Sequence, residues 1–333
     1  MEFWGGIGLP SSKNRLAPKA FVKVYTQFAD AAVRAEAMGF DAVHAPEHHF
    51  MSDGFNPYTL VPVAAMAAKT RRIKLNNGCL LLPLHDPLRV AQDMATLDVI
   101  SRGRSYGTFG IGYRPYEFLG LGTNKKTRGA RIVEMMEVID LALNNEVFSF
   151  EGKHYRYSNV RLRPRPVQRP FPRPMLFGGT SPLAARRAGS HHFPYCMAVV
   201  PYDKAVELAA EYNRAADEAG YPREKRRMAS VAFFYLAKDM KTATDLRDSY
   251  MPHFKEDITS FGYLVDAEGH HVYNPSEDDP IYQTMFRAFM PLTPPKLVDL
   301  IHDYERIGVS ALSIGTTDVD LLSKEVFPHF GKA

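Results

Sequence analysis

The chain has 333 residues, a hydrophobic content of 45% and a charged content of 23%, which is ordinary for a soluble globular protein and excludes disordered and fibrous classes. A net charge of +4 from 41 basic and 37 acidic residues, spread along the chain, does not indicate nucleic-acid binding. Two distant cysteines argue against a disulfide framework, and the absence of a signal-like start or a bilayer-length apolar stretch predicts a cytoplasmic protein without membrane contact.

Short apolar strands and amphipathic helices alternate along the first half of the chain. The spacing of apolar residues and the positions of Gly and Pro predict four strand–helix units. The expected strands are Glu2–Leu9, Asp41–Ala45, Ile73–Leu82 and Arg104–Gly112, and the expected helices are Ala17–Met38, Pro57–Lys69, Pro87–Ser101 and Arg128–Asn144.

The second half continues the alternation after a hairpin at Val147–Val160 and a proline-rich surface connector at Arg161–Pro174. The expected strands are Met175–Gly178, Phe193–Val199, Met228–Ala237 and Ser310–Gly315, and the expected helices are Ser181–Ala188, Tyr202–Ala219, Pro295–Ile307 and Val319–Phe330. Eight strands alternating with eight helices favour a (β/α)8 TIM barrel forming one domain over residues 1–333, with a doubly wound sheet as the alternative. Residues 239–291 are predicted to be an insertion after strand 7 that forms a lid.

The segment Glu47-His48-His49-Phe50 follows the second predicted strand. Barrel enzymes keep their reactive groups at the carboxyl ends of strands, and an imidazole beside a carboxylate suits general acid–base chemistry. We therefore expect His48 to be a catalytic acid or base that Glu47 orients. Two polar residues on a loop are the simpler alternative, and a metal-dependent hydrolase that uses Glu47 with His44, His85 and His191 is a further one, although the spacing matches no zinc motif.

Glycines mark two more candidate sites. In Phe177-Gly178-Gly179-Thr180-Ser181-Pro182 a strand, a Gly-Gly turn and a helix start would offer free backbone N–H groups to a phosphate, although a capped helix start also explains Ser181-Pro182. Gly78 and Cys79, on the third strand, would let the backbone approach a flat ligand, unless the glycine marks a bulge.

Four parts of the sequence resemble the bacterial luciferase-like flavin monooxygenases. They are the run from Gly39 to Phe50, the motifs Asn77-Gly78-Cys79 and Leu82-Pro83-Leu84-His85-Asp86-Pro87-Leu88-Arg89, and the predicted strand Arg104–Gly112. The resemblance covers essentially the whole chain. It implies a non-prolyl cis peptide at Gly78–Cys79 beneath the flavin ring, space for the flavin at Gly110 and Gly112, and an arginine near the phosphate, for which Arg114 stands one position later than usual.

The resemblance also implies chemistry and partners. Reduced FMN from a separate NAD(P)H-dependent reductase would react with O2 at the flavin C4a position and oxygenate a small organic substrate, in a protein that is commonly a homodimer. No metal is expected. The same superfamily contains F420-dependent oxidoreductases, against which Glu47 is mild evidence, and non-catalytic flavin-binding relatives, against which His48 speaks.

Overall fold

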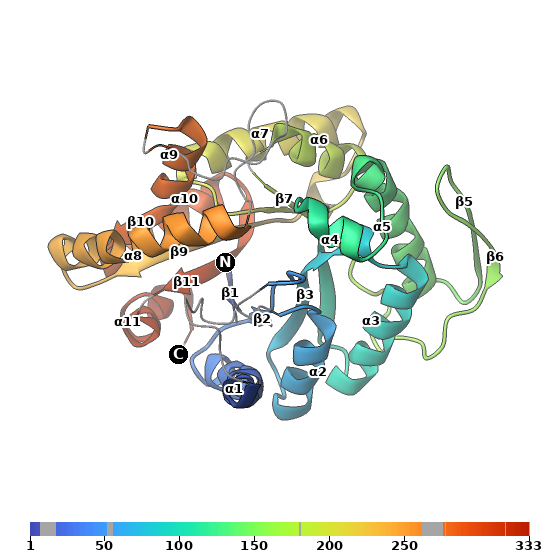
Figure 1. Cartoon of the computed structure of the whole chain (residues 1–333), viewed down its shortest axis with the longest axis horizontal. Coiled ribbons are helices and arrows are strands. Elements are labelled where there is room, and N and C mark those ends of the chain that lie inside the picture. The colour runs from blue at the N-terminus through green and yellow to red at the C-terminus, as the bar shows by residue number, and fades with distance from the viewer. Residues whose placement is uncertain are drawn as a thin grey trace. The chain divides into compact units, whose positions relative to one another are not determined.

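The computed structural model describes residues 1–6, 18–51, 56–179, 181–261, 276, 278–316 and 318–332 (Figure 1). The chain divides into two compact units, one of Gly5–Phe177 and one of Met1–Trp4 with Gly178–Ala333.

The unit Gly5–Phe177 repeats strand and helix in the predicted order. After β1 (Glu2–Gly6), its main elements are α1 (Pro18–Ala37), β2 (Ala42–His44), α2 (Leu60–Lys69), β3 (Lys74–Leu81), α3 (Pro87–Ser101), β4 (Ser105–Gly110), α4 (Pro115–Gly120), α5 (Arg128–Asn144), β5 (Phe148–Glu151), β6 (Arg156–Val160) and β7 (Met175–Gly178). The hairpin β5–β6 is confirmed. The short helix α4, opened by Pro115, was not predicted.

Strands β2, β3, β4 and β7 pair in parallel in that order. Most residues of β3 and β4 are buried, as expected for parallel strands that are covered on both faces. The register of β3 on β4 shifts between Asn77 and Leu80, and within this shift the Gly78–Cys79 peptide is cis, as predicted.

Helix α3 illustrates how local sequence sets an element's ends. Asp86 caps it by accepting a hydrogen bond from the Arg89 N–H at 2.9 Å, and Pro87 occupies the first turn. The helix ends at Arg102, which adopts the left-handed conformation and is followed by Gly103.

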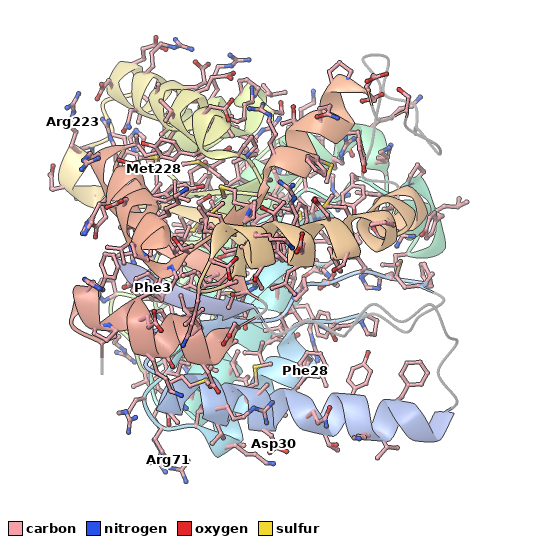
Figure 2. The ribbon with its side chains drawn as sticks, turned by 90° about the vertical axis from the view of Figure 1, so that its left-hand side faces the viewer. Phe3, Phe28, Asp30, Arg71, Arg223 and Met228 are labelled. Carbon is pink, nitrogen blue, oxygen red and sulfur yellow. The ribbon has the colours of Figure 1, made fainter. Side chains whose placement is uncertain are left out.

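Helix α1 packs one face inward and exposes the other. Phe28 is 3% exposed, whereas Asp30 lies on the outer side and forms an exposed ion pair with Lys69 of α2 at 2.7 Å (Figure 2). Amphipathic helices of this kind cover a sheet.

The predicted connector 161–174 is held by Asp98 of α3, which is fully buried. Its carboxylate accepts hydrogen bonds from the Val167 N–H at 2.7 Å, from the Gln168 N–H at 3.0 Å and from Gln168 Nε2 at 2.7 Å. One buried charge therefore satisfies three donors of a segment with no regular structure.

The unit of Gly178–Ala333 with Met1–Trp4 carries the later strands and helices. They are α6 (Pro182–Ser190), β8 (Tyr195–Met197), α7 (Tyr202–Glu218), β9 (Met228–Leu236), α8 (Met240–Phe261), α9 (Pro280–Arg287), β10 (Phe289–Leu292), α10 (Pro294–Arg306), β11 (Val309–Thr316) and α11 (Val319–Glu325). Strand β9 pairs in parallel with β8, β10 and β11. Helices α6 and α7 approach closely at Gly189, where an added Cβ would lie 2.5 Å from the Tyr212 carbonyl oxygen.

The segment 239–291 contains α8, α9 and most of β10, a strand that was not predicted. Phe289 of β10 stacks on Phe233 of β9 with ring centroids 5.1 Å apart. His270 and His271 lie outside the described residues, and the role of the segment as a lid stays a prediction.

Each of the eight predicted strands is present. The hydrogen-bonded order is β10-β9-β11-β1-β2-β3-β4-β7-β8, and β9 also pairs with β8. This topology is that of the (β/α)8 barrel, as predicted, rather than a doubly wound sheet. Among the helices of the described part of the chain, none combines the length and apolar character needed to cross a bilayer.

Candidate functional site

The predicted catalytic segment is buried just beyond β2. Glu47 is 1% exposed, His48 5% and His49 8%. The loop is closed by two hydrogen bonds at 2.9 Å, in which the His48 N–H donates to the Asn56 carbonyl and Asn56 Nδ2 donates to the Pro46 carbonyl. The three ionisable side chains are thus fixed by the fold, which argues against the alternative of loop decoration.

Glu47 does not orient His48, contrary to the sequence-based expectation. Its Oε1 accepts hydrogen bonds from His49 Nε2 at 2.9 Å and from His85 Nε2 at 2.8 Å. His85 follows β3, so this carboxylate joins the ends of two neighbouring strands. The expectation failed because proximity in sequence does not decide which side chains meet: His49 and His85 reach the Glu47 carboxylate.

Burial alone raises the pKa of the Glu47 carboxyl, but the hydrogen bonds and the charges of His49 and His85 outweigh it, so that the pKa lies below its usual value. Glu47 is therefore the acceptor of both ring N–H groups.

The carboxylate that reaches His48 is Glu117 of α4, which sequence reasoning missed. Glu117 is fully buried, and its Oε1 lies 3.3 Å from His48 Nδ1 and accepts the His49 N–H at 3.0 Å. On the other side of the ring, the Tyr113 hydroxyl lies 3.4 Å from His48 Nε2. The only sequence signal for Glu117 was its place in the first turn of a proline-opened helix beside the fourth strand.

Arg114 lies in the same network and is 2% exposed. Its guanidinium lies 3.5 Å from the Glu117 carboxylate, 4.1 Å above the Tyr116 ring and in contact with the Met51 sulfur. These contacts hold Glu117 beside His48. The expected contact of Arg114 with a phosphate stays a prediction.

Strands β3 and β4 meet closely around Gly78, Cys79 and Gly110. A Cβ on Gly110 would overlap the Cys79 sulfur, and a Cβ on Gly78 would lie 2.7 Å from Cβ of Thr108 and 2.8 Å from Oδ1 of Asn76. Both positions require glycine. Gly112, just beyond β4, has φ +69 and faces the Phe118 ring.

Buried polar atoms around this strand pair lack partners. Both side-chain atoms of Asn77, Oδ1 of Asn76 and Oγ1 of Thr108 have no hydrogen-bond partner among the described residues. Buried polar groups normally have partners, so these atoms fit a planar ligand that carries several hydrogen-bonding groups, as a flavin does.

The glycine turn belongs to the other unit. Gly178 ends β7, and Gly179 is exposed with open space where a Cβ would lie. Ser181 caps α6 by accepting a hydrogen bond from the Leu183 N–H at 3.3 Å, with Pro182 following. Thr180 lies outside the described residues. The capped helix start is thus confirmed, whereas phosphate binding stays a prediction.

A metal site of the composition considered from the sequence is not assembled within this unit. His44 donates from Nδ1 to the Gly78 carbonyl at 3.1 Å, and burial lowers its pKa to about 4. The ligand atoms of Glu47, His49 and His85 do lie within 4.8 Å of one another, a donor set that a divalent ion could use. In the structure, however, Oε1 of Glu47 already accepts one hydrogen bond from Nε2 of His49 and another from Nε2 of His85.

The sequence model of the family described as luciferase-like monooxygenase matches residues 8–310. The oxygenase component of a flavin-dependent trigonelline monooxygenase from Acinetobacter baylyi is 27% identical over 175 residues, which are 51% of this chain and 46% of that protein. An F420-dependent glucose-6-phosphate dehydrogenase from Nakamurella multipartita is 34% identical over 170 residues, 49% of each chain. The chain spans about half the length of these curated relatives.

Solved structures resemble the chain over nearly its full length. A monooxygenase from Streptomyces bottropensis superposes with a TM-score of 0.80 at 23% identity, covering 99% of this chain and 100% of that one. The oxygenating constituent of 3,6-diketocamphane monooxygenase from Pseudomonas putida, in complex with FMN, gives a TM-score of 0.74 at 20% identity and 98% coverage of both chains. These likenesses concern the fold. Because the family model spans most of the sequence, the chain belongs to the luciferase-like monooxygenase family.

Proposed function

We propose that the protein is the oxygenase component of an FMN-dependent monooxygenase that oxygenates a small organic substrate. The observation that carries this proposal is a buried histidine placed between a carboxylate and a tyrosine hydroxyl. The same unit holds the buried amide and hydroxyl atoms of β3 and β4 that have no hydrogen-bond partner in the part of the chain that the structure describes. An acid–base group beside a surface suited to a flat polar ligand is what flavin chemistry requires.

Reduced FMN, when bound, would supply the electrons that activate O2. The chain's own residues then have three tasks. Gly78, Cys79 and Gly110 leave room for the ring against the backbone, His48 serves as the acid or base of the reaction, and the apolar surroundings of Phe118, Leu81 and Leu84 exclude water. The phosphate is proposed to bind the backbone N–H groups of 178–181.

A separate NAD(P)H-dependent reductase would deliver the reduced flavin. Two relatives support this division of labour, since one is described as an oxygenase component and another as an oxygenating constituent. A homodimer and a cytoplasmic location remain part of the proposal.

An F420-dependent oxidoreductase is the second candidate, because one curated relative and one structural neighbour, a secondary alcohol dehydrogenase at a TM-score of 0.72, use F420. Titration with oxidised FMN, reduced FMN and F420 separates the two. We expect saturable binding of reduced FMN, followed by O2 uptake; tight binding of F420 with no response to O2 would contradict the proposal.

Replacement of His48 tests the acid–base role. His48→Ala should lower product formation from a panel of aldehydes and cyclic ketones by about 10²-fold or more, while the affinity for reduced FMN changes little. Phe50, 59% exposed and adjacent in sequence, offers Phe50→Ala as a control for disturbance of the loop. Wild-type turnover by His48→Ala would remove His48 from the mechanism.

A further inference from the structure

Both ring nitrogens of His48 face side chains of one short segment, 113–117. Nδ1 lies 3.3 Å from Glu117 Oε1, and Nε2 lies 3.4 Å from the Tyr113 hydroxyl. The Tyr113 and His48 rings meet edge to face, with centroids 5.7 Å apart at 74°. Tyrosine, histidine and glutamate thus form a continuous line.

The direction of the hydrogen bonds follows from Glu117. Its Oε1 accepts the His49 N–H at 3.0 Å and lies 3.5 Å from the Arg114 guanidinium, so this oxygen acts as a hydrogen-bond acceptor. An oxygen that accepts from these donors also accepts from the imidazole, so Nδ1 of His48 carries the hydrogen. In the neutral ring Nε2 is then an acceptor, and the Tyr113 hydroxyl donates to it.

Exposure decides which member of the line can meet a ligand. His48 is 5% exposed and Glu117 is fully buried, whereas Tyr113 is only partly buried. Tyr113 follows Gly112, whose positive φ turns the chain just after β4. Of the three residues, Tyr113 is therefore the most exposed, and it lies at one end of the line.

We propose, on the basis of the proposed function, that Tyr113 is the catalytic residue that exchanges the proton with the reacting atoms, and that His48 and Glu117 act behind it as positioning residues. When a substrate O–H or C–H loses its proton, that proton bonds to the Tyr113 oxygen while the Tyr113 hydroxyl proton passes to His48 Nε2. The resulting imidazolium lies against the Glu117 carboxylate. The reverse transfer returns the proton from Tyr113 to the substrate and restores neutral His48, and no group is oxidised or reduced.

Nitrogen NMR of protein labelled with ¹⁵N at the histidine rings tests the line without any cofactor, and His48→Gln identifies the His48 signals. We expect the wild-type ring to carry its hydrogen on Nδ1. Tyr113→Phe should shift the Nε2 resonance alone, and Glu117→Gln should weaken the preference for Nδ1–H. Tyr116→Phe is the matched control, because it removes a hydroxyl from the same segment outside the line. A ring protonated on Nε2, or an Nε2 signal unchanged by Tyr113→Phe, overturns the proposal.

Reoxidation of bound reduced FMN by O2 to H2O2, a reaction that consumes a proton, gives the second readout. Tyr113→Phe should reoxidise at least about tenfold more slowly than the wild type and lose its solvent deuterium isotope effect, with unchanged affinity for reduced FMN. Normal affinity with a wild-type rate contradicts the role of Tyr113 alone. Failure of the wild type and all variants to bind FMN contradicts the proposed function instead.

Discussion

One carboxylate oxygen of Glu47 accepts hydrogen bonds from the imidazoles of His49 and His85. Because the group is buried, deleting the carboxylate leaves two ring N–H groups without their acceptor. The loop beyond β2 and the residue His85 beyond β3 would then lose their shared anchor. Glu47 therefore stabilises the folded protein in addition to being part of the candidate site.

We expect Glu47→Ala to lower the free energy of unfolding by about 3 kcal/mol, since each abandoned buried donor costs roughly 1 to 3 kcal/mol. Glu47→Gln should cost less, because its amide oxygen still accepts one N–H. Urea denaturation measures both. The control is Glu218→Gln, which removes an exposed ion pair with Arg214 and should change stability by less than about 0.5 kcal/mol. Equal losses in Glu47→Ala and Glu218→Gln would contradict the anchoring role.

His44 gives the fold a pH dependence of known sign. Burial lowers its pKa to about 4, below the ordinary value of 6.5, so the unfolded chain binds the proton more readily. Its contribution is therefore complete above pH 6.5 and is lost as the pH falls towards 4. The shift corresponds to at most about 3 kcal/mol, and less because the side chain keeps some exposure.

The measurement is urea denaturation of the wild type and His44→Gln at pH 7.5, 5.5 and 4.5. We expect the wild type to lose more stability across this series than the variant, in which residue 44 does not titrate. Parallel losses would show that other groups cause the acid sensitivity.

At the residue scale the sequence indicated which segment carries the candidate site, but not which of its side chains pair with one another. The Glu47–His48–His49 segment was predicted because it follows a strand. Glu117 was missed because it lies 69 residues from His48 and no periodicity links a loop to a helix start so far along the chain. Pairing across that distance depends on tertiary packing.

At the scale of elements, Asp98 shows how a helix can organise an irregular segment. It collects backbone and side-chain donors of Val167 and Gln168 and a hydroxyl contact from Ser105 at 3.2 Å. The connector, which the sequence predicted to be a stiff surface segment, is therefore anchored to the packed structure through Asp98.

Asp98→Asn should destabilise the protein by about 2 kcal/mol or more, because an amide group would place N–H donors against the backbone N–H groups of the connector. Hydrogen exchange should increase at Val167 and Gln168 and stay unchanged in the hairpin β5–β6. Uniform acceleration across the chain would instead indicate a global loss of stability with no special hold on the connector.

The elements that were predicted are those with a clear pattern, namely buried apolar strands and helices with marked ends. Strand β10 was missed because Pro291 argues against a strand. Proline is tolerated there because β10 stands at one end of the strand order, where its missing N–H leaves no neighbour without a partner. Helix α4 was missed because six residues are too few for a helical period.

At the scale of the whole molecule, the alternation of strands and helices was sufficient to predict the barrel. Parallel strands joined by helical crossovers leave few topologies, so the class follows even where individual boundaries move by a few residues. Which residues come together in one site could not be predicted in the same way, because that depends on which strand ends are neighbours in the folded protein.

The whole protein should function without a metal. Exhaustive treatment with a chelator, followed by elemental analysis, should leave FMN binding and turnover unchanged, because hydrogen bonds already join Glu47, His49 and His85. The control is the same preparation resupplied with zinc. Loss of turnover on chelation and its recovery with zinc would favour the metal-dependent hydrolase.

Glu47 and Glu117 each use one carboxylate oxygen in the contacts described above, and the second oxygen of each, Oε2, has no partner among the described residues. Both atoms are buried, so an incoming compound does not reach them, and each bears the desolvation cost of a buried acceptor without a hydrogen bond.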